Sequence, residues 1–186
     1  MKIIGIVGSL RAGSFNRKLL HLVKDLLPEE VELIDLDYKD VPVFNEDTEF
    51  PTPKRVEEIR QEIKEADGVF FFVPEYNQGI SGALKNLIDW ISRPVSFETM
   101  EKVLVHKPAA MMGATLGVGG SITAQENLRS YLAFMNVPVM PQPRANISQV
   151  NRFIDEQGNM TLDQVTLDFV RQTALGFVEF IKLHQK

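Results

Sequence analysis

The chain has 186 residues, enough for one domain with a substantial core, and its 44% hydrophobic and 24% charged residues are ordinary for a globular protein. Its formal net charge of −5 argues against a nucleic-acid partner, because a phosphate backbone attracts a basic surface. It contains no cysteine, which excludes disulfides and thiol chemistry, so any redox role requires a bound cofactor.

The first half of the chain alternates short apolar runs with longer amphipathic stretches. The apolar runs at 2–7, 31–36 and 69–73 predict strands. Apolar residues recur at helical spacing over 15–27 and 56–66, which predicts helices there. The run at 69–73 is apolar without interruption, as expected of a strand covered on both faces in a parallel sheet.

The second half continues the same alternation. Helical spacing predicts three more helices, at 83–91, 121–135 and 169–181. Two more strands are predicted, at 108–112 and 137–140. Five strands alternating with five helices indicate an α/β fold with a parallel sheet, covered by helices on both faces, in a single domain over 1–186.

The longest irregular stretch, 37–53, contains three prolines. Loops of this length in compact domains are often functional, although a plain surface excursion fits the pattern equally well. The sequence leaves its role open.

The sequence also predicts a cytoplasmic protein without a membrane partner. Its longest apolar stretches fall short of the roughly 18 residues that span a bilayer. The apolar run near the N-terminus is too short for the core of a signal peptide.

Three unusual loops follow the first, third and fourth predicted strands, at 8–16, 74–79 and 113–120. In an open parallel sheet, ligands bind beyond the carboxyl ends of the strands. Because all three loops would lie at that edge, we expect a ligand site there.

The first loop carries four polar side chains suited to a phosphate, Ser9, Arg11, Ser14 and Asn16. Gly8 and Gly13 permit positive φ, which would turn backbone N–H groups inward, and the helix starting near Phe15 directs its positive end to the same place. The alternative is that Ser14 only caps the helix and Arg11 is a solvated charge. The loop lacks the P-loop and dinucleotide signatures and therefore suits a monoester phosphate.

The second and third loops suit a flat ring. Pro74 keeps the preceding residue extended and ends the strand, and Glu75, Tyr76 and Asn77 follow with backbone N–H groups and an aromatic face. The glycine-rich stretch 113–120 lets a ring lie against the backbone. The alternatives are a surface turn and a flexible loop.

These motifs resemble the NADPH-dependent FMN reductase family of the flavodoxin-like fold, in Gly8-Ser9-Leu10-Arg11 with Ser14 and Asn16, in Pro74-Glu75-Tyr76-Asn77, in 113–120 and in the helix within 79–90. The resemblance implies a doubly wound, five-stranded parallel sheet of strand order 2-1-3-4-5 with bound FMN. By resemblance, the FMN phosphate would be held by Ser9, Arg11, Ser14 and Asn16, with Phe15 as a further cofactor contact. The flavin ring would be held by Pro74, Glu75, Tyr76 and Asn77, and its other edge would be lined by Gly113, Ala114 and Gly117.

The resemblance also implies an oxidoreductase. NADPH or NADH would pass hydride to the FMN, and electrons would then reach a small-molecule acceptor such as a quinone, azo compound, free flavin or metal oxyanion. The family's usual assembly implies a homodimer or homotetramer. The alternatives are a flavodoxin-like electron carrier and a flavin-free scaffold, and a net charge of −5 is modest for a carrier that docks by electrostatics.

The remaining polar residues offer few further candidates. His21, His106 and His184 are scattered along the chain, so a metal site or a histidine catalyst is not expected. Arg93, Arg129 and Arg144 are candidates for the 2′-phosphate of NADPH, and each is equally read as a surface or interface charge.

Overall fold

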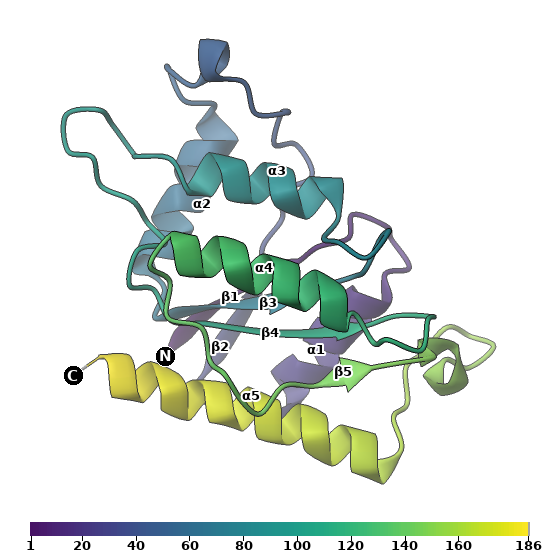
Figure 1. Cartoon of the computed structure of the whole chain (residues 1–186). Helices are drawn as coiled ribbons and strands as arrows, with labels where there is room; N and C mark the ends of the chain where they lie inside the picture. The colour runs from purple at the N-terminus through teal and green to yellow at the C-terminus, as the bar shows by residue number, and fades with distance from the viewer. Residues whose placement is uncertain (186) are drawn as a thin grey trace.

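The computed structural model describes residues 1–185 and contains a five-stranded parallel sheet of order β2-β1-β3-β4-β5, as predicted (Figure 1). Its strands are β1 Lys2–Val7, β2 Glu32–Asp35, β3 Gly68–Phe72, β4 Ala109–Ala114 and β5 Asn146–Ile147. Its helices are α1 Phe15–Leu26, α2 Lys54–Glu65, α3 Gly82–Ile91, α4 Ile122–Phe134 and α5 Gln164–His184, with short 3-10 turns η1 Glu46–Thr48 and η2 Val150–Phe153.

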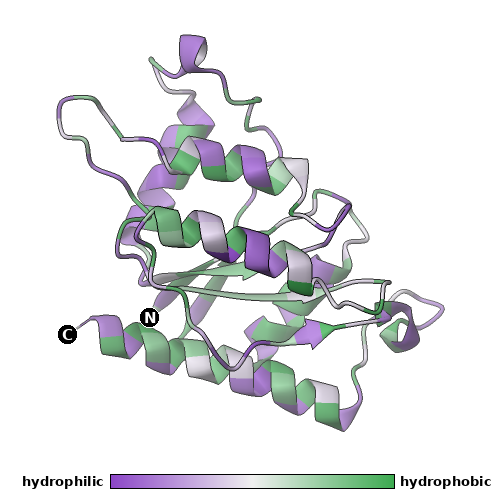
Figure 2. Cartoon of the chain, viewed as in Figure 1, coloured by the Kyte–Doolittle hydropathy of each residue, from purple (hydrophilic) through white to green (hydrophobic). Residues whose placement is uncertain are grey.

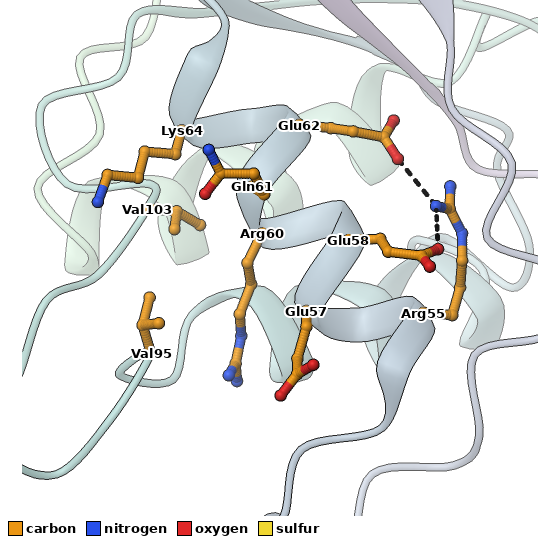
Figure 3. Close-up of a pocket in the computed structure, with 9 residues that line it drawn as sticks. All are labelled: Arg55, Glu57, Glu58, Arg60, Gln61, Glu62, Lys64, Val95 and Val103. Carbon is orange, nitrogen blue, oxygen red and sulfur yellow. Dashed lines mark hydrogen bonds and ion pairs between the residues drawn. The ribbon is translucent and has the colours of Figure 1, made fainter.

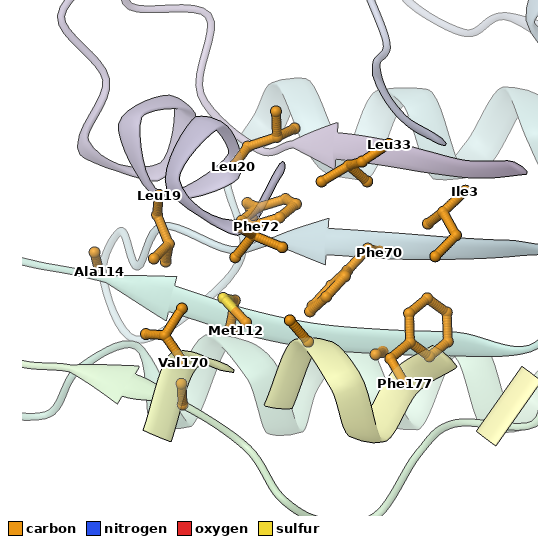
Figure 4. Packing of buried hydrophobic residues seen from close by; sticks show 14 of the residues in the cluster. Ile3, Leu19, Leu20, Leu33, Phe70, Phe72, Met112, Ala114, Val170 and Phe177 are labelled. Atoms are coloured by element: carbon orange, nitrogen blue, oxygen red, sulfur yellow. The ribbon is translucent and has the colours of Figure 1, made fainter. Parts of the chain in front are cut away.

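Strand β3 shows why the sheet is buried on both sides. Every residue of this strand is buried, and successive side chains enter opposite halves of the core. Phe70 and Phe72 pack in the half that contains α1 and α5, where Phe177 contacts Phe70 edge-on with ring centroids 5.1 Å apart (Figure 4). Phe71 packs in the half that contains α2, α3 and α4.

The helices present apolar stripes to these two halves of the core. Figure 2 shows hydrophobic residues dominating the central strands and mixed with hydrophilic ones along the helices. Helix α1 buries Leu19, Leu20 and Val23 against the sheet, and helix α3 buries Leu84 and Leu87 on the opposite face. The predicted three-layer arrangement, with helices on both faces, is therefore confirmed.

The end of β4 differs from the prediction. The strand extends to Ala114 rather than stopping at Met112, so Gly113 and Ala114 belong to the sheet. The reason is pairing: Gly113 and Ala114 lie in register with Asn146 and Ile147 of β5. The glycine-rich loop is correspondingly shorter than expected.

The predicted fifth strand at 137–140 is also wrong. In that segment Val139 forms only an isolated parallel bridge with Ala109, and the edge strand β5 lies further along the chain. Pro141 and Pro143 separate the two pairing segments. Because proline has no N–H to donate, it interrupts the ladder and divides the edge of the sheet in two.

The long loop 37–53 is packed against α3. The carbonyl of Pro42 accepts hydrogen bonds from Trp90 Nε1 at 2.8 Å and Asn86 Nδ2 at 2.9 Å. The buried carboxylate of Glu49 accepts two hydrogen bonds from Arg93, from Nε at 2.9 Å and from Nη2 at 2.8 Å. This loop therefore helps to fix α3, which follows the second of the three loops described above.

Within residues 1–185, no helix combines the length and the apolar character needed to cross a membrane.

Candidate functional site

The three loops converge at the carboxyl edge of the sheet and enclose a pocket of about 300 Å³. That volume lies at the lower end of the roughly 300–1,000 Å³ typical of small-molecule sites. The pocket is lined by Ser9, Arg11, Ser14, Phe15, Asn16, Pro74, Glu75, Tyr76, Ala114, Thr115, Leu116 and Gly117. These include every predicted site residue except Asn77 and Gly113, and add Thr115 and Leu116.

A larger hollow of about 660 Å³ lies away from these loops, along α2 (Figure 3). It is lined mainly by charged side chains, and Arg55 pairs there with Glu58 at 3.1 Å and Glu62 at 2.8 Å. Volume alone would favour this hollow. The smaller pocket is the better candidate because it combines the start of a helix, a cation and an aromatic side chain.

The first loop ends in an open helix terminus. Ser14 caps α1, since its Oγ accepts the Arg17 N–H at 3.3 Å. Among the described residues, the N–H groups of Phe15 and Asn16 have no protein acceptor. Arg11 is exposed, with its guanidinium 4.8 Å from the Phe15 ring centroid and Nη2 2.6 Å from the Gly13 carbonyl. These donors form a site suited to an anion.

The predicted role of the two glycines in this loop is wrong. Neither Gly8 nor Gly13 adopts a positive φ. The Gly8 N–H is already bonded to the Phe72 carbonyl at 2.9 Å, and a Cβ on Gly8 would lie 2.7 Å from Pro74 Cδ. Gly8 therefore permits the close approach of the first and second loops rather than an inward turn of N–H groups.

The second loop is a tight reversal. Tyr76 and Gly79 exchange backbone hydrogen bonds of 3.0 and 2.9 Å, and the two residues between them, Asn77 and Gln78, have φ of 51° and 60°. Two successive positive φ values are typical of a type I′ turn. Asn77 lies exposed in this turn and outside the pocket lining, whereas Tyr76, 54% exposed, lines the pocket.

Three side chains tie the loops to one another. Both ends of the Asn16 amide bond the backbone of Ala114, at 3.0 Å each. Ser81 donates to the Gly8 carbonyl and caps α3 by accepting the Leu84 N–H at 3.1 Å. Glu75 Oε2 accepts the Ala124 N–H at 2.9 Å. These contacts bond the first loop to the end of β4 and to the start of α3, and they bond the second loop to the start of α4.

Sequence reasoning missed Ser81. The available signal was a serine immediately before an apolar helical repeat, a pattern typical of a helix N-cap. Its second contact, with Gly8 across 73 positions of the chain, has no local sequence signature.

The remaining candidates lie elsewhere. His21, His106 and His184 are absent from the pocket lining. Arg93 pairs with Glu49, and Arg144 pairs with Glu126. The hydrogen bond from Arg144 lowers the pKa of the Glu126 carboxyl. Arg129 also lies near this carboxyl, at 3.8 Å. Within residues 1–185, acidic and histidine side chains form no cluster suited to a metal ion.

Comparison with known proteins agrees with this geometry. Residues 1–152 match the family of NADPH-dependent FMN reductases. The chain belongs to the NADPH-dependent FMN reductase family. It is an oxidoreductase that uses NAD(P)H as electron donor and FMN as cofactor, as this family does, and the electron-carrier alternative is disfavoured.

Individual relatives cover nearly the whole chain. An NAD(P)H-dependent FMN reductase of Pseudomonas aeruginosa is 38% identical over 173 residues, covering 92% of this chain and 90% of the relative. A quinone reductase of Escherichia coli K12 is 33% identical over 185 residues, covering 98% and 96%. The solved flavoenzyme NAD(P)H:(acceptor) oxidoreductase of Paracoccus denitrificans superposes with a TM-score of 0.87 at 32% identity, covering 98% of each chain.

The groups that line the pocket fit the chemistry of FMN. The two N–H groups without a protein acceptor at the start of α1 and the exposed Arg11 guanidinium match a monoester phosphate. Tyr76 and Leu116 add apolar surface suited to a ring, beside the backbone near Gly117. Groups suited to a phosphate and groups suited to a ring thus lie in one pocket.

Proposed function

We propose that the enzyme binds FMN in the pocket between the three loops and reduces quinone-type acceptors with electrons from NAD(P)H. The observation that carries the proposal is the combination of an open helix terminus, an exposed cation and an aromatic side chain in one pocket. The E. coli relative, a quinone reductase, supports a quinone as acceptor.

The residues of the pocket divide into a group for the phosphate and a group for the ring. The N–H groups of Phe15 and Asn16 together with Arg11 would hold the phosphate, while Ser9 and Ser14 line the pocket beside them. Pro74 and Tyr76 on one side and Ala114 and Gly117 on the other would hold the ring. FMN, when bound, supplies the hydride chemistry.

Tyr76 and Leu116 favour a flat acceptor. They are 54% and 62% exposed although both line the pocket. A planar, partly apolar molecule would cover these side chains and displace water from them. The same surface suits a nicotinamide ring, so donor and acceptor would occupy it in turn.

Three further features complete the proposal, namely the assembly, the domain organisation and the location in the cell. Phe134 on α4 is 90% exposed beside a hollow of about 400 Å³ between α3 and α4, which supports association into a homodimer or homotetramer. Residues 1–186 would form one FMN-binding domain. We place the enzyme in the cytoplasm, where NAD(P)H is available.

The deciding experiment is anaerobic mixing of the FMN-loaded protein with NADPH and, separately, with NADH. Loss of the oxidised flavin absorbance, followed by its return on addition of 1,4-benzoquinone, is the expected result. Protein that holds FMN but is not reduced by either nucleotide would instead be an electron carrier. Reduction by nucleotide without reoxidation by the quinone would refute the acceptor class alone.

A further inference from the structure

Glu75 is the single acidic residue among those that line the pocket. A carboxylate beside a site for an anionic cofactor is electrostatically unfavourable unless its charge is compensated. Its compensation comes from helix α4, because Oε2 accepts the N–H of Ala124, the third residue of that helix, at 2.9 Å.

Helix α4 receives no capping bond from the side chain of its own cap residue, and Glu75 supplies such a bond instead. Ser121 precedes the helix with a φ of 66° and makes no side-chain capping bond. Its hydroxyl instead accepts a hydrogen bond from Gln125 Nε2 at 2.9 Å. A carboxylate at the start of a helix both satisfies an N–H group and offsets the positive end of the helix dipole. Glu75 does this from a position 49 residues earlier in the chain.

The start of α4 also lies against the pocket wall. Ser121 is completely buried, and a Cβ added to Gly113 would lie only 2.0 Å from its Oγ. Gly113 directly precedes Ala114, which lines the pocket. The positive end of α4 and the carboxylate of Glu75 are therefore both neighbours of the space assigned to the flavin ring.

We propose that Glu75 is a positioning residue that holds the ring loop against α4 and, by offsetting the positive end of that helix, lowers the reduction potential of the bound flavin. This inference rests on the proposed FMN site. Reduced flavin carries more negative charge than oxidised flavin, so a neighbouring carboxylate opposes reduction and an exposed helix N-terminus favours it. The side chain thereby acts on the cofactor through α4 rather than by binding it.

The test is the Glu75→Gln variant, which keeps an oxygen acceptor for Ala124 and removes the charge. Potentiometric titration of the FMN-loaded protein should show a higher potential than in the wild type. We expect reduced FMN to gain about two- to tenfold in affinity relative to oxidised FMN, judged from the strength of charge–dipole interactions at helix ends. The upper limit corresponds to about 30 mV for a two-electron couple.

The matched control is Asp163→Asn. Asp163 caps α5 in the same way, by accepting the Thr166 N–H at 2.8 Å, and it is absent from the pocket lining. This variant should leave the flavin potential unchanged. An equal potential in the wild type and Glu75→Gln, or an equal shift in both variants, would overturn the proposal.

A second variant separates positioning from charge. Glu75→Ala removes the acceptor as well, so amide hydrogen exchange at Ala124 in the FMN-free protein should accelerate, and FMN affinity should fall at least several-fold. Glu75→Gln should restore both properties while keeping the raised potential. Unchanged exchange at Ala124 in Glu75→Ala would contradict the capping contact. A wild-type protein that fails to bind FMN would refute the proposed function itself.

Discussion

The side-chain amide of Asn16 on α1 is bonded at both ends to the backbone of Ala114 on β4, with Nδ2 donating to the carbonyl and Oδ1 accepting the N–H, each at 3.0 Å. Asn16 is 3% exposed. With its oxygen and one of its N–H groups bonded to Ala114, this buried side chain joins two walls of the pocket. Among the described residues, the backbone N–H of Asn16 has no protein acceptor.

We therefore expect Asn16→Ala to act on stability before it acts on binding. The change leaves two buried backbone groups of Ala114 without their partner, each worth about 1–3 kcal/mol when unsatisfied. The free energy of unfolding of the FMN-free protein should therefore fall by about 2–6 kcal/mol. Urea unfolding measures this directly. Asn127→Ala is the control, because within residues 1–185 the Asn127 side chain bonds only the Thr123 carbonyl of its own helix. Lost FMN binding with normal unfolding would instead identify the Asn16 side chain as a ligand.

Arg11 should show the opposite behaviour. Arg11 is exposed, and among the described residues its guanidinium contacts the Gly13 carbonyl and the ring of Phe15. Arg11→Ala should therefore barely change the free energy of unfolding of the FMN-free protein. A lost charge-assisted bond to phosphate, worth about 1.5–3 kcal/mol, should weaken FMN binding about 10- to 150-fold. Quenching of FMN fluorescence measures the affinity.

Arg17→Ala provides the contrast for Arg11. Arg17 lies on α1, the helix that follows the loop of Arg11, and pairs with Oδ2 of Asp35. The other carboxylate oxygen of Asp35 is buried without a hydrogen-bond partner among the described residues. Its removal should reduce stability more than Arg11→Ala does and reduce FMN affinity less. Equal FMN affinity in Arg11→Ala and the wild type would remove Arg11 from the site.

The sequence predicts most of this architecture because its signals are local. The uninterrupted apolar run in β3 and the helical repeat of α1 each reflect burial of the segment itself. The place of the edge strand depends instead on Pro141 and Pro143 and on which segment reaches β4. That competition is tertiary, which explains why the prediction at 137–140 failed.

The candidate site divides in the same way. Arg11 and Tyr76 could be selected from residue type and position after a strand, and both line the pocket. The contacts of Ser81 with Gly8 and of Glu75 with Ala124 join segments 73 and 49 positions apart. No spacing rule in the sequence anticipates them. The lack of a side chain at Gly8 matters for close packing against Pro74 and not for a positive φ.

Gly113 near the end of β4 and Gly117 in the third loop should tolerate alanine very differently. A Cβ at Gly113 would lie 2.3 Å from the Val73 carbonyl oxygen, whereas a Cβ at Gly117 meets nothing within 4 Å. Gly113→Ala should destabilise the FMN-free protein by at least the roughly 1–3 kcal/mol typical of overpacking. Gly117→Ala should leave its melting temperature nearly unchanged. Similar melting temperatures for the two variants would contradict the close packing of β4 against β3 and α4.

Tyr38 should make the free energy of unfolding fall as the pH rises into the alkaline range. It is 3% exposed, its hydroxyl donates to the Val7 carbonyl at 2.6 Å, and burial raises its pKa above the ordinary value. Its contribution is therefore complete below the unfolded pKa of about 10 and is lost as the pH rises beyond it, by about 1.4 kcal/mol per unit. Tyr38→Phe should be less stable than the wild type at about pH 8 yet lose less stability on going to about pH 11. If urea unfolding shows that the wild type and Tyr38→Phe lose the same free energy of unfolding over this pH range, Tyr38 is not the group responsible.

Phe134 provides the test of assembly. A phenylalanine that is 90% exposed gains from burial against another chain, and the hollow beside it is lined by Ile88, Tyr131 and Met135 as well as by charged groups. Phe134→Lys should shift the mass measured by light scattering toward the monomer without lowering the stability of the fold, since the side chain packs little within its own chain. Leu183→Lys, at a residue 66% exposed on α5, is the control and should leave the mass unchanged. A Phe134→Lys protein that keeps the wild-type mass would place any association on another surface.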